Sequence, residues 1–211
     1  MEILKINFSN PDMNNIEKAV RVIRLGGAVV YPTDTIYGLG VDALRVSSVE
    51  RLFKIKKRPL NKPVPVMVKD IDMAKEIAFI DDKIERILKK IWPGPITIVL
   101  RKRSIVPATL TAGRNNIGLR IPDCLICKKI MEILDAPITC TSANISGENP
   151  SVCVKDVIEA FKNYPRPDLI LDAGCIKHKA PSTVLDLTGT KPKFLRIGPV
   201  SKQDLLKILG I

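Results

Sequence analysis

One stretch, GAVVYPTDTIYGLG at 27–40, constrains the fold of this chain more than any other. Its apolar first half is typical of a short buried strand, and Pro32 marks where pairing stops, because proline cannot donate a ladder hydrogen bond. Polar side chains follow at once, from Thr33 to Tyr37. Since α/β folds bind ligands at the carboxyl ends of their strands, this junction predicts a ligand site, although an ordinary capped loop has the same pattern.

Strand-like and helix-like segments alternate along the rest of the chain. Asn14-Asn15 can cap the first helix, and Ser47 to Glu50 has the Ser-x-x-Glu form of a capping box. With no repeat and no linker, this interleaving predicts one α/β domain over 1–211 with a mixed sheet. Further strands are expected at 64–68, 96–100, 118–122, 137–141, 169–172, 182–187 and 194–197, the last two as a hairpin, and further helices at 71–79, 82–91, 124–134, 154–162 and after Ser201.

The chain carries a formal net charge of +12 over 211 residues. This charge favours an anionic partner such as a nucleic acid, a nucleotide or a phosphorylated substrate, although a basic average also occurs without such a role. The sequence has no run of about 18 apolar residues and no export signal, so we expect a cytoplasmic protein without a membrane span.

The cysteines and the histidine do not suggest a metal site. Five cysteines, an odd number, do not resemble a disulfide framework in a chain of this length, and we expect them to be reduced. Cys124-x-x-Cys127 lacks the two further ligands of a zinc site. The single histidine, His178, lies between lysines and is expected to be solvated, so no Ser-His-Asp triad is predicted.

Four basic residues are candidates for binding an anion. Lys56 and Arg58 lie two residues apart, which in an extended segment puts both side chains on one side, where they could hold one polyphosphate. A solvated basic helix end has the same pattern. Arg120 and Arg196 lie in or at the end of apolar strands, where a guanidinium needs an anionic partner, either a ligand or a structural carboxylate.

A second strand end also delivers polar groups. Ser142 and Asn144 follow the strand expected at 137–141, and the free amides of such a turn can hold a phosphate or a carboxylate. The chain contains neither a Walker-type phosphate loop nor a Gly-x-Gly-x-x-Gly fingerprint, so any nucleotide must bind in another way.

Six motifs occur in order: Tyr-Pro-Thr-Asp-Thr-Ile-Tyr-Gly-Leu-Gly at 31–40, Lys-x-Arg-Pro at 56–59, Trp-Pro-Gly-Pro-Ile-Thr at 92–97, Gly-Leu-Arg-Ile-Pro at 118–122, Thr-Ser-Ala-Asn-Ile-Ser-Gly at 141–147 and Pro-Ser-Thr-Val-Leu-Asp at 181–186. With them the chain resembles the YrdC-domain family of L-threonylcarbamoyladenylate synthases over about 15–200. The resemblance implies a single α/β domain with a twisted mixed sheet flanked by helices and a large basic cavity. Longer members of the family also have a second C-terminal domain, which we do not expect in this chain.

The implied reaction joins L-threonine, bicarbonate or CO2, and ATP with Mg²⁺ into threonylcarbamoyl-AMP and pyrophosphate. A partner transferase system would then modify adenosine 37 of ANN-decoding tRNAs, with direct tRNA contact possible but not required. By position in the motifs, the residues implied in catalysis are Lys56, Arg58, Ser142 and Asn144; those implied for threonine are Thr33, Thr35, Arg120, Ser142 and Ser182; those implied for ATP are Lys56, Arg58, Asn61, Lys62, Asn144, Ser151 and Arg196.

The chain departs from family members that carry a histidine in the strand after Lys-x-Arg-Pro, because it has Val-Met-Val at 66–68. A threonine contact from that strand therefore stays open. The rival interpretation is a double-stranded RNA or ribosome-binding module, for which the net charge is also suited. A third interpretation is a domain of the same fold that uses carbamoyl phosphate. Such domains usually belong to much larger chains with zinc-finger cysteines, which this sequence lacks.

Overall fold

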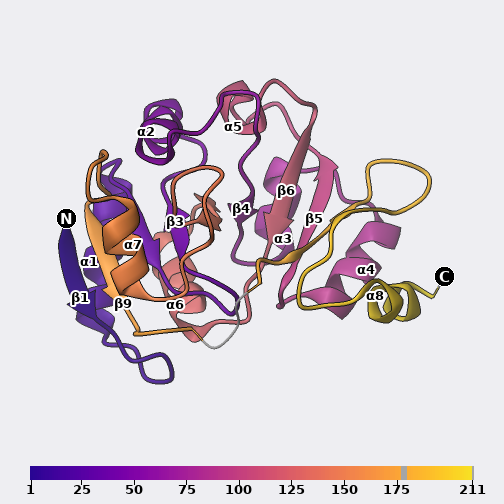
Figure 1. The fold of residues 1–211 in the computed structure, drawn as a ribbon. Helices are drawn as coiled ribbons and strands as arrows, with labels where there is room; N and C mark the ends of the chain where they lie inside the picture. The colour runs from indigo at the N-terminus through magenta and orange to yellow at the C-terminus, as the bar shows by residue number, and fades with distance from the viewer. Residues whose placement is uncertain (177–179, 211) are drawn as a thin grey trace.

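The computed structural model describes residues 1–176 and 180–210 and confirms the mixed α/β class. The strands form two mixed sheets rather than the single sheet we expected, one on each side of the molecule in Figure 1. The first sheet has the strand order β1 (Glu2–Lys5), β9 (Leu169–Asp172), β2 (Val29–Tyr31), β3 (Gly38–Gly40) and β8 (Thr141–Ser142). The second sheet has the strand order β11 (Lys193–Arg196), β10 (Thr183–Asp186), β5 (Ile96–Arg101), β6 (Asn116–Arg120), β4 (Val66–Met67) and β7 (Ile138–Thr139).

Helices cover the outer faces of both sheets (Figure 1). The first helix, α1, buries Ile16, Ala19, Val20 and Ile23 at the predicted helical spacing, and it packs against β9 and α6. The helices are α1 (Met13–Arg24), α2 (Val46–Lys56), α3 (Ile71–Ile77), α4 (Asp82–Ile91), α5 (Ala108–Thr111), α6 (Leu125–Leu134), α7 (Val154–Ala160) and α8 (Lys202–Leu209). Within the described residues, none is long and apolar enough to cross a membrane.

The strand expected at 137–141 is where the two sheets meet. Residues Ile138–Thr139 pair with β4 of the second sheet, whereas Thr141–Ser142 pair with β3 of the first. Cys140 lies between them, and its amide donates to the carbonyl oxygen of Pro65 at 2.7 Å. One continuous segment therefore changes sheets at this residue and ties the two halves of the molecule together.

Two predicted helix caps were wrong. Asp12, not the Asn14-Asn15 pair, caps α1, because its carboxylate accepts the Asn14 amide. The second helix begins after Arg45 without any side-chain cap, so Ser47, the cap residue of the expected Ser-x-x-Glu box, lies inside the helix. The cap of α8 by Ser201 and the β10–β11 hairpin are confirmed.

The expectation that all cysteines are reduced was also wrong. Cys153 and Cys175 form a disulfide that joins the start of α7 to the segment after β9. These residues also form a β-bridge, so tertiary pairing brings together two cysteines that lie 22 positions apart in the chain. Cys124, Cys127 and Cys140 are free. The expectation for His178 lies outside the described residues.

Candidate active site at the junction of the sheets

Seven of the predicted site residues line one pocket of about 180 Å³ where the two sheets meet. The pocket collects ends of strands from both sheets and the segment after α2, so residues far apart in the sequence face one space. Three guanidinium groups and several hydroxyls border it, and no carboxylate is among its described lining residues. The seven residues are Thr33, Thr35, Arg58, Arg120, Ser142, Ser182 and Arg196.

Thr33 and Thr35 form a tight hydroxyl turn directly after β2. The Thr33 hydroxyl donates to the carbonyl oxygen of Ile36 at 2.7 Å and accepts the amides of Thr35 and Ile36. Its oxygen also lies 3.0 Å from the Thr35 hydroxyl, and both side chains are buried. Thr33 therefore organises the turn, while Thr35 also contacts Arg120.

Arg120, at the end of β6, is fixed by three different acceptors. Its guanidinium forms an ion pair with Asp34 and donates to the Thr35 hydroxyl at 3.0 Å and to the Gly94 carbonyl oxygen at 3.1 Å. The Arg120 side chain is 5% exposed, so this ion pair is nearly dry. Asp34 thus supplies the structural carboxylate that a guanidinium in a strand requires, and Arg120 still borders the pocket.

Arg196 lies at the end of β11 and is held by oxygens of one serine. Its guanidinium donates to the Ser182 carbonyl oxygen at 2.9 Å and to the Ser182 hydroxyl at 3.2 Å. The Ser182 hydroxyl in turn lies 2.8 Å from that of Thr97. Among the described contacts Arg196 has no carboxylate partner, and burial and the nearby Arg120 lower its pKa. Its charge is therefore available to an anion in the pocket.

Lys56, the last residue of α2, lies beneath the turn that carries Ser142 and Asn144. Its ammonium group donates to the carbonyl oxygens of Ser142 and Asn144, and the lysine is 1% exposed. Burial, and secondarily the charge of Arg58, lower the pKa of Lys56 to about 7. The structure thus places Lys56 as a positioning residue for the turn, outside the lining of the pocket itself.

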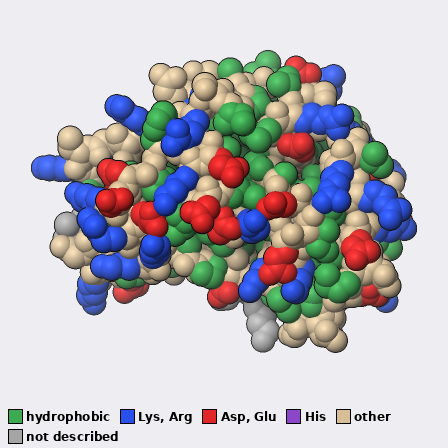
Figure 2. All heavy atoms as spheres, turned by 180° about the vertical axis from the view of Figure 1, so that it is seen from behind, with side chains coloured by type: hydrophobic (Ala, Val, Ile, Leu, Met, Phe, Trp, Pro, Cys, Tyr) green, Lys and Arg blue, Asp and Glu red, His purple; other side chains and the backbone are tan. Residues whose placement is uncertain are grey.

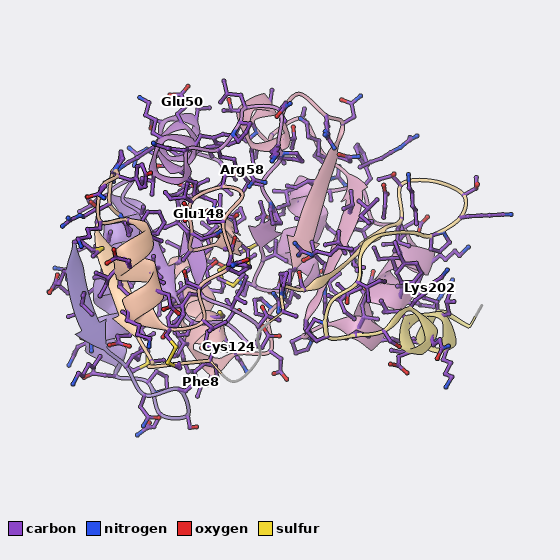
Figure 3. All side chains as sticks on the ribbon, viewed as in Figure 1. Phe8, Glu50, Arg58, Cys124, Glu148 and Lys202 are labelled. Atoms are coloured by element: carbon purple, nitrogen blue, oxygen red, sulfur yellow. A yellow bond between two sulfur atoms is a disulfide. The ribbon has the colours of Figure 1, made fainter. Side chains whose placement is uncertain are left out.

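Arg58 borders the pocket from the loop after α2, and Figure 3 shows it in the upper middle of the molecule. Its guanidinium donates to the carbonyl oxygens of Lys62 at 3.0 Å and Pro63 at 2.6 Å, which holds the loop in place. The left-handed conformation of Lys57, with φ 48°, ends the helix and turns the chain toward the pocket.

Five of the seven residues predicted for ATP do not line this pocket: Lys56, Asn61, Lys62, Asn144 and Ser151. Asn61 and Lys62 are exposed on the loop that Arg58 holds. Ser151 is buried, and its carbonyl oxygen accepts the amide of Tyr37, while its neighbour Pro150 borders the pocket.

A larger cavity, of about 740 Å³, lies elsewhere, between α3, α4 and α6. Lysines and carboxylates both line it, so it is not basic in character. A pocket of about 180 Å³ is below the usual range of about 300–1,000 Å³ for ligand sites. It suits a small amino acid, and a nucleotide would have to extend out of it.

Sequence reasoning named Asp34 within the polar cluster but missed its partner. The Asp34–Arg120 ion pair could have been predicted, because an arginine within a strand needs a carboxylate partner and Asp34 lies between Thr33 and Thr35, both predicted to bind threonine. The roles of Thr97 and Cys140 had no such signal, since both depend on which strands pair.

The chain as a whole is similar to known proteins. A family model described as "Telomere recombination", for the Sua5/YciO/YrdC domain, matches residues 21–198. The chain belongs to the Sua5/YciO/YrdC family. The resemblance seen in the six motifs is thereby confirmed.

Relatives within the Sua5/YciO/YrdC family cover nearly all of this chain. The threonylcarbamoyl-AMP synthase of Pyrococcus abyssi is 36% identical over 196 residues, which are 92% of this chain and 57% of that protein. A Methanocaldococcus jannaschii protein, provisionally named as the same synthase, is 32% identical over 208 residues, 98% of this chain and 97% of its own length. The chain therefore spans little more than half of the first relative and almost all of the second.

Solved structures of the Sua5/YciO/YrdC family agree with the fold. Pyrococcus abyssi Sua5 complexed with L-threonine matches with a TM-score of 0.94 at 34% identity, over 100% of this chain and 61% of that one. Escherichia coli YciO matches with a TM-score of 0.88 at 29% identity, over 98% of this chain and 100% of that one. The two-sheet arrangement thus belongs to a fold seen in the family.

Proposed function

We propose that this chain is an L-threonylcarbamoyladenylate synthase, which makes threonylcarbamoyl-AMP and pyrophosphate from L-threonine, bicarbonate or CO2, and ATP. The observation that carries the proposal is the pocket itself, where Arg58, Arg120 and Arg196 face one small space bordered by hydroxyls. The names of the Pyrococcus abyssi relatives, one a synthase and one a complex with L-threonine, support the same substrates.

The proposed chemistry requires alignment and charge neutralisation more than proton transfer. The amine of threonine adds to CO2 to give a carbamate, and a carbamate oxygen then attacks the α-phosphorus of ATP while pyrophosphate leaves. Both reactants are anions, so their approach needs fixed positive charge. Arginines held by backbone carbonyls, as Arg58 and Arg196 are, supply such charge without moving during the reaction.

In this proposal the threonine carboxylate faces Arg120 and Thr35, which the ion pair with Asp34 holds in place. The phosphates face Arg58 and Arg196. Mg²⁺ enters with ATP as part of the substrate, because this ion is usually held by the substrate phosphates and waters with at most one or two protein carboxylates. Lys56 acts through the turn at Ser142 and Asn144, whose carbonyl oxygens it holds.

The product would pass to a transferase system that modifies adenosine 37 of ANN-decoding tRNAs. Lysine and arginine side chains are spread over the face seen in Figure 2, with aspartate and glutamate side chains between them, rather than gathered in one basic track. This distribution gives no support for the RNA-binding alternative on that face. The proposal therefore does not require tRNA to contact this chain.

Product identification tests the proposal. The purified chain, incubated with Mg·ATP, L-threonine and ¹³C-bicarbonate, is expected to yield threonylcarbamoyl-AMP that carries the ¹³C atom, as mass spectrometry of the quenched reaction would show. Formation of AMP or ADP without the labelled adduct would contradict the proposal. The Arg86→Gln variant, changed at an exposed residue of α4, is the matched control for the pocket variants below.

A further inference from the structure

The Cys124-x-x-Cys127 motif remains without a role in the proposed reaction. We propose that Cys124 and Cys127 are a redox-active dithiol, which a low-molecular-weight disulfide oxidises to an intramolecular Cys124–Cys127 disulfide. The inference does not depend on the proposed function, because it concerns chemistry of these two thiols alone. It assigns a modification site directly behind the strand end that carries Thr33 and Thr35.

The geometry brings the two sulfurs together. Cys124 is the N-cap of α6 and Cys127 is the third residue of the helix, and residues at this spacing lie on the same face. Both Sγ atoms point at one acceptor, the carbonyl oxygen of Pro32, at 3.5 Å for Cys124 and 3.3 Å for Cys127. The shared acceptor therefore holds the two sulfurs close together on one side of the turn.

Both thiols are buried, but both border a cavity, and Cys124 is the more exposed of the two. Cys124 is 5% exposed and Cys127 1%, and both line the cavity of about 740 Å³. Figure 3 shows Cys124 in the lower middle of the molecule. The cavity gives a small disulfide a path to both thiols, and we expect it to meet the more exposed Cys124 first. This is the arrangement of an attacking thiol and a resolving thiol.

The electrostatic surroundings also favour Cys124 over Cys127 as the attacking thiol. The neighbouring Cys127 thiol lowers the pKa of Cys124, and the backbone amides of Cys127 and Ile126 at the helix N-terminus lower it further, against the opposite effects of burial and of the Asp34 charge. Burial raises the pKa of Cys127. Cys124 is therefore the thiol that reacts first, because the thiolate is the nucleophile.

The proposed oxidation is two successive thiol–disulfide exchanges. The Cys124 thiolate attacks one sulfur of the small disulfide, whose S–S bond breaks and releases one thiolate. Cys127 then loses its proton to solvent, and its thiolate attacks Cys124 Sγ, which expels the second small thiolate. Two electrons and two protons leave the protein dithiol, and the small disulfide becomes two thiols.

Oxidation would alter the support of the candidate site. Both thiol hydrogens that now point at the Pro32 carbonyl oxygen are lost in the disulfide. Asp34 lies two residues after Pro32 and forms an ion pair with Arg120. Its carboxylate also accepts the backbone amide of Asp123, the residue before Cys124. The thiols are thus linked to the pocket through Pro32, Asp34 and Arg120. We expect the backbone amides of residues 32–36 to become less protected from hydrogen exchange on oxidation.

Two simpler roles for the pair are less consistent with the structure. A metal site lacks ligands, because no group of three histidine, cysteine, aspartate or glutamate side chains among the described residues could hold an ion. Inert core thiols would be buried without a path from solvent, whereas Cys124 and Cys127 both border a large cavity.

Peptide mapping after equilibration with oxidised glutathione tests the inference. Trypsin releases residues 121–128 as one peptide that contains both cysteines, which separates them from the Cys153–Cys175 disulfide. We expect this peptide from folded protein to be lighter by two hydrogens and resistant to alkylation, and reduction with dithiothreitol to reverse both changes. Two free, alkylatable thiols after the same treatment would overturn the proposal.

Two serine variants identify the attacking thiol. In Cys127→Ser, which keeps Cys124, we expect stable glutathionylation of Cys124; in Cys124→Ser we expect Cys127 to react at least tenfold more slowly. Equal rates would overturn the assignment of roles. Amide hydrogen exchange of the wild-type protein, oxidised against reduced, should show faster exchange at 32–36. Unchanged exchange there would contradict the link to the pocket.

Discussion

The ammonium nitrogen of Lys56 lies 2.7 Å from the backbone carbonyl oxygen of Asn144, and the lysine is 1% exposed. Its described polar contacts are all oxygens of Ser142 and Asn144. A helix end is thereby attached to the turn after β8 by a buried cation without a carboxylate partner in the described residues. This arrangement is costly in isolation, which suggests that the shape of the turn matters for the pocket beside it.

Comparison with the Lys56→Met variant should reveal the cost of burying this ammonium group as a pH dependence of the free energy of unfolding. The pKa of Lys56 is about 7 in the folded protein, below its ordinary value of 10.5, so between these values the unfolded chain binds more protons. The wild-type stability therefore rises with pH in this window relative to Lys56→Met, by about 2 kcal/mol between pH 7 and pH 9. Urea denaturation of both proteins at the two pH values measures it. A difference that does not change with pH would contradict the lowered pKa.

Asp34→Asn should destabilise the protein by about 3 kcal/mol, because it leaves the buried Arg120 guanidinium without its counter-charge. The free energy of unfolding from urea denaturation measures this loss. The matched control is Asp72→Asn, whose carboxylate is 92% exposed and 3.9 Å from Lys75, and which should leave stability unchanged. Equal effects of the two variants would show that the Asp34–Arg120 pair contributes no more than a surface contact.

Arg58→Gln should weaken ATP binding by about ten- to a hundredfold, the usual loss for a charge-assisted hydrogen bond worth about 1.5–3 kcal/mol. Arg58 borders the pocket, and its removal also frees the carbonyl oxygens of Lys62 and Pro63. Calorimetric titration with Mg·ATP measures the affinity, with circular dichroism to verify the fold. If Arg58→Gln bound ATP as tightly as the Arg86→Gln control, Arg58 would not contact the nucleotide.

Local patterns predicted most of the fold. The buried face of α1 and the strands β5, β6 and β9 follow from periodicity and β-branched composition, which act within a few residues. The division into two sheets could not be predicted in this way, because it depends on Cys140 meeting Pro65, a contact between segments remote in sequence. The Cys153–Cys175 disulfide was missed for the same reason.

The residues predicted for the candidate site only partly come together in the structure. Motif positions indicated seven residues that do line one pocket. Sequence spacing placed Lys56 and Arg58 side by side on an extended segment, whereas Lys56 ends a helix and points to the turn at Ser142 and Arg58 reaches the pocket. Lys57, between them, has a left-handed backbone conformation, so the side chains of Lys56 and Arg58 point in different directions. Residue spacing in the sequence does not reveal such a turn.

The requirement for threonine and bicarbonate in pyrophosphate release tests the central claim most directly. Release is measured with Mg·ATP and both co-substrates, and then with threonine or bicarbonate omitted in turn from carbonate-depleted buffer. We predict release only when both are present, together with its loss in Arg120→Gln while Arg86→Gln keeps it. Release that persists without threonine, or no release with all substrates present, would contradict the proposed synthase function.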